Sequence, residues 1–167
     1  MNNLKWSSLL PLEEYLKAPN HAGVYEIGFK VSGHHARQSY TFGLNAVSYP
    51  VDFMPMYVGK SESSLRYRLG AHARAGSHAN KKIREYHKER ERLKQQGVQL
   101  PPAFEGLYFT CVALQEPRYF EGFVRLQYFK YPWNKKKERK AIKDAEGKLS
   151  EDLGYYFRPM ATLYRDC

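Results

Sequence analysis

Two polar side chains interrupt the apolar side of a predicted helix, and both are able to bind an anion. That side is formed by Leu65, Arg68, Leu69 and His72, whose offsets of 0, 3, 4 and 7 residues share one helical face. An inward-facing guanidinium is costly unless an anionic group pairs with it. The sequence therefore indicates either a carboxylate inside the protein or a phosphate in a cleft beside Arg68. His72 can donate to the same anion or serve as a structural core residue.

The segment Tyr57–Lys60, with the sequence YVGK, is the other feature that suggests chemistry. A strand ends there in a glycine, which permits a close approach of the backbone to another group, and a lysine follows. The spacing differs from that of a phosphate-binding loop, which has two glycines flanking four residues before its lysine. Taken alone, the segment indicates a close contact but no particular reaction.

The elements that must position these residues include both strands and helices. Periodicity and turn residues predict strands at 23–31, 56–59 and 106–114. Helices are predicted at 8–17, 61–74, 80–96 and 118–131. Residues 32–55 contain two glycines and two prolines and are predicted to form a long hairpin arm or insertion, with a strand near 38–44. We therefore expect one α/β domain with a small, mostly antiparallel sheet of about three strands flanked by helices.

The boundaries of the helices are marked by capping and breaking residues. Ser8 and Ser61 are predicted to cap the first two helices, Gly97 to end the third, and Pro117 to open the fourth. The strand at 106–114 is the most apolar of the three, so we expect it at the centre of the sheet.

The positive charge of the chain gathers in two segments. The net charge of the 167 residues is +10. Residues 60–95 hold 11 Lys or Arg against 4 acidic residues, and residues 134–148 hold 7 against 3. Charge separated in this way is typical of proteins that bind a polyanion such as a nucleic acid, although solvated charged surfaces have a similar composition.

Composition also excludes several classes of protein. Hydrophobic residues make up 43% of the sequence, which is typical of a folded domain. The sequence lacks the run of about 18 apolar residues that a membrane-spanning helix needs. Cys111 and Cys167 are too few for a disulfide scaffold and lack the paired spacing of a zinc site. We expect a reducing, cytoplasmic location and no membrane partner.

Gly23-Val24-Tyr25, followed downstream by Tyr57-Val58-Gly59, resembles the paired motifs of the GIY-YIG nuclease family. Members of that family have an arginine on the helix after the second motif, and Arg68 stands eleven residues after Tyr57. His72, one turn beyond Arg68, is similar to a histidine found in several members. Arg66 is a competing candidate, but on a helix it points about 160° away from Arg68 and lies off the apolar side.

A later segment extends the resemblance to residues 22–134. Glu121 stands where the family places a metal-binding glutamate at the start of a helix. In the family that helix ends in a proline and an asparagine, which Pro132 and Asn134 match. Five motifs therefore occur in the family's order.

The expected domain organisation includes a long insertion between the two tyrosines and a C-terminal extension. Tyr25 and Tyr57 are 32 positions apart, which is longer than in many members and resembles restriction enzymes of the family that have a longer hairpin there. The length of 167 residues predicts that residues 1–167 form a single domain. Its catalytic core would be residues 20–134, and residues 135–167 would be a basic C-terminal extension that packs on the core.

The resemblance implies an endonuclease that hydrolyses DNA phosphodiester bonds with a single Mg²⁺ or Mn²⁺ ion. Arg68 would clamp the scissile phosphate, because its planar fork suits phosphate oxygens. Glu121 would hold the metal ion through oxygen. Two alternatives concern the carboxylate: Glu121 can instead pair with Arg125 on the helix surface, and Glu116 is a second candidate that more simply marks the helix start.

The remaining candidates act on the attacking water or shape the site. Tyr25 or Tyr57 would position or deprotonate the water, and Lys60 or His72 would supply the cation that lowers the pKa of that tyrosine. The alternatives are that both tyrosines only pack in the core and that Lys60 is a surface residue. The residues expected to be structural parts of the motifs are Gly23, Gly59 and Asn134.

Basic residues outside these motifs are expected to follow the DNA backbone, which gives affinity and salt dependence rather than sequence choice. They are Lys81, Lys82, Arg84, Lys135, Lys136 and Lys137. An alternative for 80–96 is a solvated helix held by internal pairs such as Lys81–Glu85. Two other functions stay open: a non-catalytic nucleic-acid-binding module of the same fold, and a nuclease that acts on RNA or single strands. A homodimer is a further possibility.

Overall fold

A computed structural model describes residues 4–31, 40–42, 45–48, 52–115, 117–127 and 131–134. The first half of the chain forms, in order, β1 (Leu4–Lys5), β2 (Leu10–Pro11), the 3₁₀ helix η1 (Leu12–Lys17), β3 (Gly23–Lys30), β4 (Tyr40–Phe42), β5 (Asn45–Ser48) and β6 (Phe53–Ser61). The second half forms α1 (Leu65–Ala73), α2 (Lys81–Gln95), the 3₁₀ helix η2 (Pro102–Phe104), β7 (Tyr108–Ala113) and α3 (Pro117–Gln127).

The main sheet has four strands in the order β2-β7-β3-β6, and each neighbouring pair is antiparallel. Three of them are long, and β2 adds two residues at one edge. This arrangement confirms the predicted small antiparallel sheet of an α/β fold. The segment expected at the centre forms β7, one of the two inner strands: it lies between the short β2 and the long β3.

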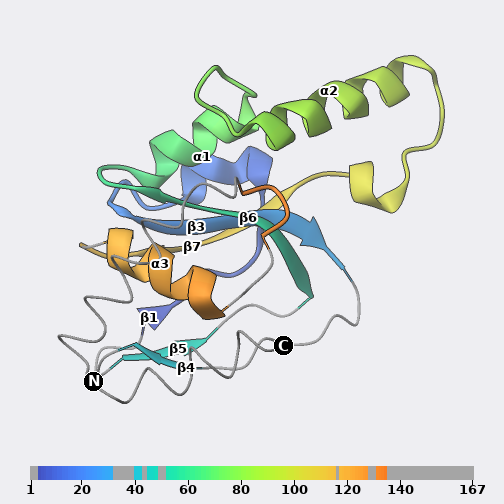
Figure 1. Ribbon diagram of the computed structural model, residues 1–167. Helices are drawn as coiled ribbons and strands as arrows, with labels where there is room; N and C mark the ends of the chain where they lie inside the picture. Colours follow the sequence, from blue (N-terminus) through green and yellow to red (C-terminus); the bar gives the residue numbers. More distant parts are fainter. Residues whose placement is uncertain are drawn as a thin grey trace.

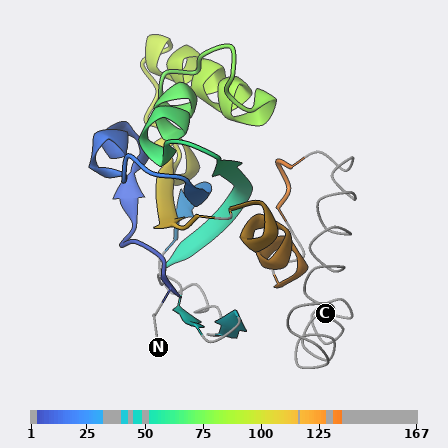
Figure 2. The ribbon, with the colours of Figure 1, turned by 90° about the vertical axis from the view of Figure 1, so that its left-hand side faces the viewer.

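Alternating side chains of β3 divide the core into two layers. Tyr25 and Ile27 belong to the layer that also holds buried residues of η1, α1 and α2. Val24 and Glu26 point to the opposite face, because successive strand residues alternate between faces. All four side chains are fully buried. Figures 1 and 2 show α1 and α3 on opposite sides of the sheet, so β3 is covered on both faces.

A second, small sheet has the strand order β1-β5-β4. β4 and β5 form an antiparallel pair, in which Phe42 lies opposite Asn45, and β1 runs parallel to β5. The hairpin β4–β5 lies between the two tyrosine motifs, as the predicted arm requires. β4 lies within the strand expected near 38–44, and β5 was not expected; residues 32–39 lie outside the described part of the chain.

The first two helix starts differ from the predictions. The helix predicted at 8–17 is wrong in its first half, because Leu10–Pro11 pairs with β7 and only Leu12–Lys17 is helical, as a 3₁₀ helix. Ser64, not Ser61, caps α1: its hydroxyl accepts the backbone N–H of Tyr67 at 3.1 Å. Ser61 ends β6, and its hydroxyl accepts the N–H of Ser64 at 2.9 Å, which turns the chain into the helix.

The later helices follow their predicted signals. Asn80 caps α2, and Gly97, with a φ of 66°, follows its end in the left-handed conformation that glycine favours. α3 begins at Pro117 as predicted and is described to Gln127. The basic extension 135–167 lies outside the described residues. Within the residues that are described, no helix has the length and apolar character that spanning a bilayer requires.

Candidate active site

Three rings from separate elements meet on the face of the sheet that α1 covers. The hydroxyl oxygen of Tyr25 on β3 lies 2.8 Å from Nε2 of His72 on α1. The ring centroid of His72 lies 5.5 Å from that of Tyr25 and 5.4 Å from that of Tyr57 on β6. Tyr25 and His72 are fully buried, whereas Tyr57 is half-buried. The two motif tyrosines therefore share one histidine, with Tyr57 on the solvent side.

The two motif glycines make this arrangement possible. Gly59 pairs with Tyr25 across the β3–β6 ladder, and a β-carbon at position 59 would come within 2.4 Å of the Tyr25 hydroxyl oxygen. The Tyr25 ring can lie across β6 only because position 59 has no side chain. At Gly23 a β-carbon would come within 2.2 Å of the carbonyl oxygen of Val112 and 2.7 Å of Leu65. Both glycines are thus fixed by close approach, not by an unusual backbone conformation.

Arg68 brings a positive charge to the two tyrosines. Its Nη1 donates to the carbonyl oxygen of His78 at 2.9 Å, which anchors a half-buried guanidinium. Burial acts to lower the pKa of Arg68, but the charge and hydrogen bonding of Tyr25, and then of Tyr57, raise it above its usual value. Arg66 instead donates from Nε to the carbonyl oxygen of Ala18 at 3.1 Å and lies on the exposed side of α1. The geometry therefore favours Arg68 over Arg66.

His72 is a neutral residue of this cluster. Burial first, and then the charges of Arg68 and His87, lower the pKa of His72 to about 3. Its Nδ1 accepts the backbone N–H of Asn80 at 3.2 Å, and its carbonyl oxygen accepts Nε2–H of His87 at 3.1 Å. His72 thus cannot be the cation expected to lower the pKa of a tyrosine at neutral pH.

The pKa of Tyr25 lies well above its usual value. Burial is the largest cause and the charge of Tyr57 adds to it, while the charge and hydrogen bonding of Arg68 act in the opposite direction. Lys60 does not contribute to this shift; it forms an ion pair with Glu62. Arg68 is therefore the cation that favours ionisation of Tyr25, in place of the expected Lys60 or His72.

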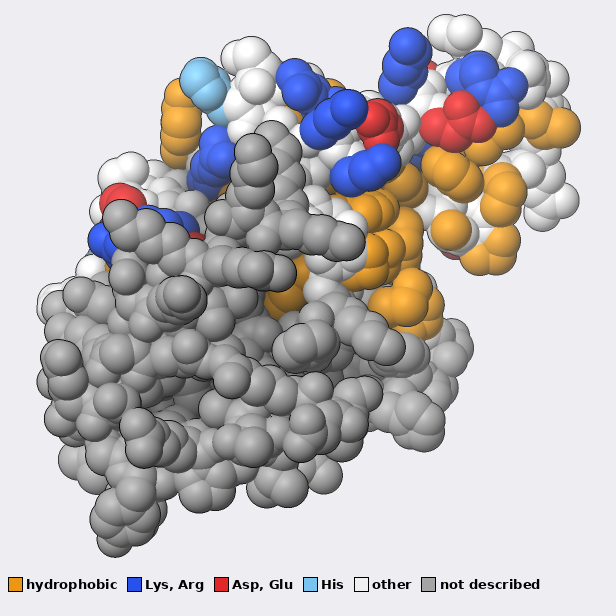
Figure 3. All heavy atoms as spheres, viewed as in Figure 1, with side chains coloured by type: hydrophobic (Ala, Val, Ile, Leu, Met, Phe, Trp, Pro, Cys, Tyr) orange, Lys and Arg blue, Asp and Glu red, His pale blue; other side chains and the backbone are white. Residues whose placement is uncertain are grey.

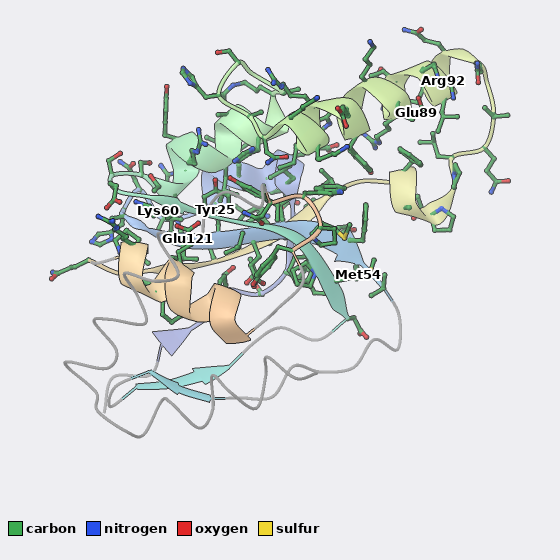
Figure 4. The ribbon with its side chains drawn as sticks, viewed as in Figure 1. Tyr25, Met54, Lys60, Glu89, Arg92 and Glu121 are labelled. Atoms are coloured by element: carbon green, nitrogen blue, oxygen red, sulfur yellow. The ribbon has the colours of Figure 1, made fainter. Side chains whose placement is uncertain are left out.

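Lys60 and Glu121 belong to the other layer of the domain. Lys60 lies opposite Val24 in the β3–β6 ladder, one position away from the Gly59–Tyr25 pair, so it points to the face that α3 covers. Glu121 lies in α3, which packs on β3 and β6, and its side chain is only 6% exposed. Figure 4 shows Tyr25, Lys60 and Glu121 at the same end of the sheet in this view. β6 is an outer strand of this sheet, and it carries a residue of each layer, Tyr57 and Lys60.

A short segment after α3, residues 131–134, is hydrogen-bonded to the outer edge of β6. The side-chain amide of Asn134 accepts the N–H of Val58 and donates to the carbonyl oxygen of Val58, both at 2.9 Å. The N–H of Trp133 donates to the carbonyl oxygen of Met56, also at 2.9 Å. The predicted structural role of Asn134 therefore has a definite geometry, in which its amide takes the place of a neighbouring peptide group.

The chain matches a known family of domains. A model of GIY-YIG domain-containing proteins matches residues 12–146. The chain belongs to the GIY-YIG family. GIY-YIG domains are the domains of a nuclease family, and the first motif, the second motif and Arg68 all fall within the match. Searches of curated proteins and of solved structures found no significant match.

Three residues near the site of this GIY-YIG domain were not predicted from the sequence. Asn80 and His87 contact His72, and Glu26 is a fully buried carboxylate that accepts a hydrogen bond from Tyr131. A signal existed for two of them. Asn80 precedes a long charged helix, as an N-cap does, and Glu26 is an acid inside an apolar strand. Nothing in the sequence pairs His87 with His72.

The basic surface of the GIY-YIG domain is partly neutralised by its own acids. Figure 3 shows lysine and arginine side chains over the part of the surface that α2 occupies, with acidic side chains among them. Lys82 lies 2.9 Å and Lys81 3.8 Å from Glu85, which confirms the internal Lys81–Glu85 pair. Arg84 and Lys88, one turn apart on α2, have no such pair in the described part of the chain. The residues Lys135, Lys136 and Lys137 lie outside the described residues.

Proposed function

We propose that this GIY-YIG domain is a DNA endonuclease that hydrolyses phosphodiester bonds with the help of one divalent metal ion, Mg²⁺ or Mn²⁺. The observation that carries the proposal is the position of Arg68. Its guanidinium is anchored on the carbonyl oxygen of His78, interacts with Tyr25 and Tyr57, and stays half-exposed. No acidic group neutralises it in the contacts described, so a phosphate is the ligand that suits its charge and planar shape.

The two tyrosines have unequal access to solvent, which suggests unequal roles. Hydrolysis joins a water oxygen to phosphorus and breaks the bond to one sugar oxygen, so a proton must leave the water and a proton must reach the leaving oxygen. Tyr57 is half-buried and can contact such a water, whereas Tyr25 is fully buried beneath it. We assign contact with the water to Tyr57 and orientation of Tyr57 and Arg68 to Tyr25.

Glu121 is the residue proposed to hold the metal ion. The described residues contain no group of three or more His, Cys, Asp or Glu side chains suited to a metal. A single glutamate nevertheless fits Mg²⁺ or Mn²⁺, because such hard ions often bind one or two carboxylates and keep several waters. The bound ion would supply Lewis-acid stabilisation of the charge on the phosphate and on the leaving oxygen. Lys60 lies in the same layer and would attract the DNA phosphates.

The basic residues of α2 are proposed to hold the flanking DNA. Lys81 and Lys82 share Glu85, so Arg84 and Lys88 offer the less neutralised charges. Contacts of this kind release counterions from DNA and give affinity without sequence choice. The segment 135–137 would add to this surface.

A plasmid-nicking assay tests the proposal. Wild-type protein with Mg²⁺ or Mn²⁺ is expected to convert supercoiled DNA to nicked or linear forms, and EDTA to stop it. Arg68→Ala and Glu121→Gln are expected to lose cleavage on the order of 100-fold or more while keeping most of their DNA affinity. Arg66→Ala is the matched control, since Arg66 lies on the same helix but its exposed side chain donates to the carbonyl oxygen of Ala18, away from the tyrosines. Melting curves show whether each variant is folded.

The outcomes separate the alternatives. DNA binding without cleavage by the wild type, unchanged in Glu121→Gln, would identify a non-catalytic binding module. Faster cleavage of RNA or of single-stranded DNA than of plasmid would show that one of these, and not duplex DNA, is the preferred substrate. A restriction-type function predicts cuts at one defined sequence, and a functional homodimer predicts cleavage of both strands in one encounter.

A further inference from the structure

Asn80 joins three separate elements beside the tyrosine cluster. Its side-chain Oδ1 caps α2 by accepting the N–H groups of Lys82 at 2.8 Å and Ile83 at 3.4 Å. Its Nδ2 donates to the carbonyl oxygen of Trp133 at 3.2 Å, in the segment that is hydrogen-bonded to the edge of β6. Its backbone N–H donates to Nδ1 of His72. The side chain of Asn80 thus fixes the position of a backbone donor that faces the histidine.

That donor determines the tautomer of His72. A neutral imidazole has one N–H and one acceptor nitrogen, and Nδ1 must be the acceptor because a backbone N–H points at it. The proton of the neutral ring is therefore on Nε2, where it is donated to the hydroxyl oxygen of Tyr25 at 2.8 Å. The opposite tautomer would place Nδ1–H against the N–H of Asn80.

The direction of the Tyr25–His72 bond has a consequence for Tyr25. Because its oxygen accepts from His72, the hydroxyl proton of Tyr25 is not used in this bond and can be donated toward Tyr57, whereas Arg68 can only donate to the Tyr25 oxygen. The charged groups near the histidine are Arg68 and, when protonated, His87; both disfavour the imidazolium. The neutral Nε2–H form is the state that this environment selects.

We propose that Asn80 is a positioning residue of the nuclease site, which holds His72 as the Nε2–H tautomer and so directs the hydroxyl proton of Tyr25 away from His72. Through Trp133 it also links this tautomer to the segment on β6. The role in catalysis rests on the proposed nuclease function, but the effect on the tautomer does not.

Nuclear magnetic resonance of protein labelled with ¹⁵N-histidine tests the tautomer directly. Long-range proton–nitrogen correlations at neutral pH are expected to show His72 in the wild type as a neutral ring protonated on Nε2. Asn80→Ala removes both the capping oxygen and the amide donor. It is expected to give a mixture of the two tautomers, or His72 signals that are broadened by exchange between them. A wild-type His72 protonated on Nδ1, or charged at neutral pH, would overturn the proposal.

Cleavage kinetics test the consequence for the reaction. Asn80→Ala is expected to lower kcat on the order of tenfold with little change in KM, since the residue acts on geometry and not on DNA contact. Asn80→Ser keeps a capping oxygen and is expected to recover part of the loss together with the tautomer. Gln95→Ala, in the last turn of α2, is the exposed control and should match the wild type.

The two readouts separate this inference from the proposed function. An Asn80→Ala protein that keeps both the wild-type tautomer and the wild-type kcat refutes the positioning role. A wild type that never cleaves DNA or RNA refutes the nuclease proposal and with it the catalytic part of the role, while the spectra of the two proteins still decide whether Asn80 controls His72.

Discussion

The hydroxyl oxygen of Tyr25 lies so close to Gly59 that a β-carbon at position 59 would stand 2.4 Å from it. The Tyr25 ring is fully buried and bonded to His72, so it cannot move aside without losing that bond. Gly59→Ala is therefore expected to lower the stability by about 1–3 kcal/mol, as overpacking does. It should also reduce cleavage strongly, because both motif tyrosines shift. Urea unfolding and plasmid nicking measure the two effects.

Gly106→Ala provides the matched control for this prediction. A β-carbon at Gly106 would meet nothing within 4 Å, and the residue precedes β7 outside the site. Stability and cleavage should stay close to the wild type. Equal effects of the two substitutions would contradict the close-approach explanation of Gly59.

Removal of single hydroxyl groups should distinguish the two tyrosines. Tyr25→Phe leaves the buried Nε2–H of His72 without its acceptor, which is expected to lower the stability by about 1–3 kcal/mol. Tyr57→Phe changes a half-buried residue, and we expect less than about 1 kcal/mol. Both should impair cleavage. If Tyr57→Phe cleaved like the wild type, the assignment of the water contact to Tyr57 would be wrong.

The neutral state of His72 should make stability depend on pH. The pKa of His72 is lowered to about 3 in the folded protein by burial, Arg68 and His87, and an unfolded histidine titrates near about 6.5. Between these values the unfolded state binds more protons, so stability falls as the pH falls. The slope from this group is at most about 1.4 kcal/mol per pH unit. The contribution is complete above the unfolded pKa.

Comparison with His72→Gln isolates this effect. Urea unfolding of both proteins between the two pKa values should show a flatter pH dependence for the variant, whatever its absolute stability. The lowered pKa of His87 and the acidic residues contribute to both proteins and cancel in the difference. Parallel curves would show that His72 titrates normally in the folded state.

The salt dependence of DNA binding should identify the contacts of α2. Arg84→Gln combined with Lys88→Gln is expected to reduce the slope of log affinity against log salt by up to about 2, the value for two lost phosphate contacts. The paired residues serve as the control: Arg92→Gln combined with Lys94→Gln removes charges that already pair with Glu89 and Glu91. A larger effect of the control pair would place the DNA elsewhere.

The fold was largely predictable because its signals are local. The β-formers of residues 23–31 and the periodicity of 61–74 and 80–96 identify elements that the structure confirms to within a few residues. Pro11 shows the limit. The leucines around it suggest one helix, yet Leu10–Pro11 pairs with a strand about a hundred positions later, and such long-range pairing leaves no periodic signal.

The sequence indicated which candidate residues lie close together better than it indicated their hydrogen bonds. The apolar stripe of α1 correctly separated Arg68 from Arg66, because helical geometry alone decides which of them faces the sheet. The partner of His72 could not be predicted, since the bond to Tyr25 joins residues 47 positions apart. Likewise, the identity of the cation beside Tyr25 could not be predicted, because it depends on the face of β6 to which each side chain points. Lys60 points to the face opposite Tyr25.

The amide of Asn134 occupies both hydrogen-bonding groups of Val58 on the outer strand of the sheet. An unprotected outer strand invites a strand from another molecule to join it, which leads to aggregation or to unwanted assemblies. A visiting strand at β6 would first have to displace this amide and the neighbouring bond from Trp133. One polar side chain can therefore keep the sheet from growing sideways at Val58, next to the Gly59 position on which the tyrosine site depends.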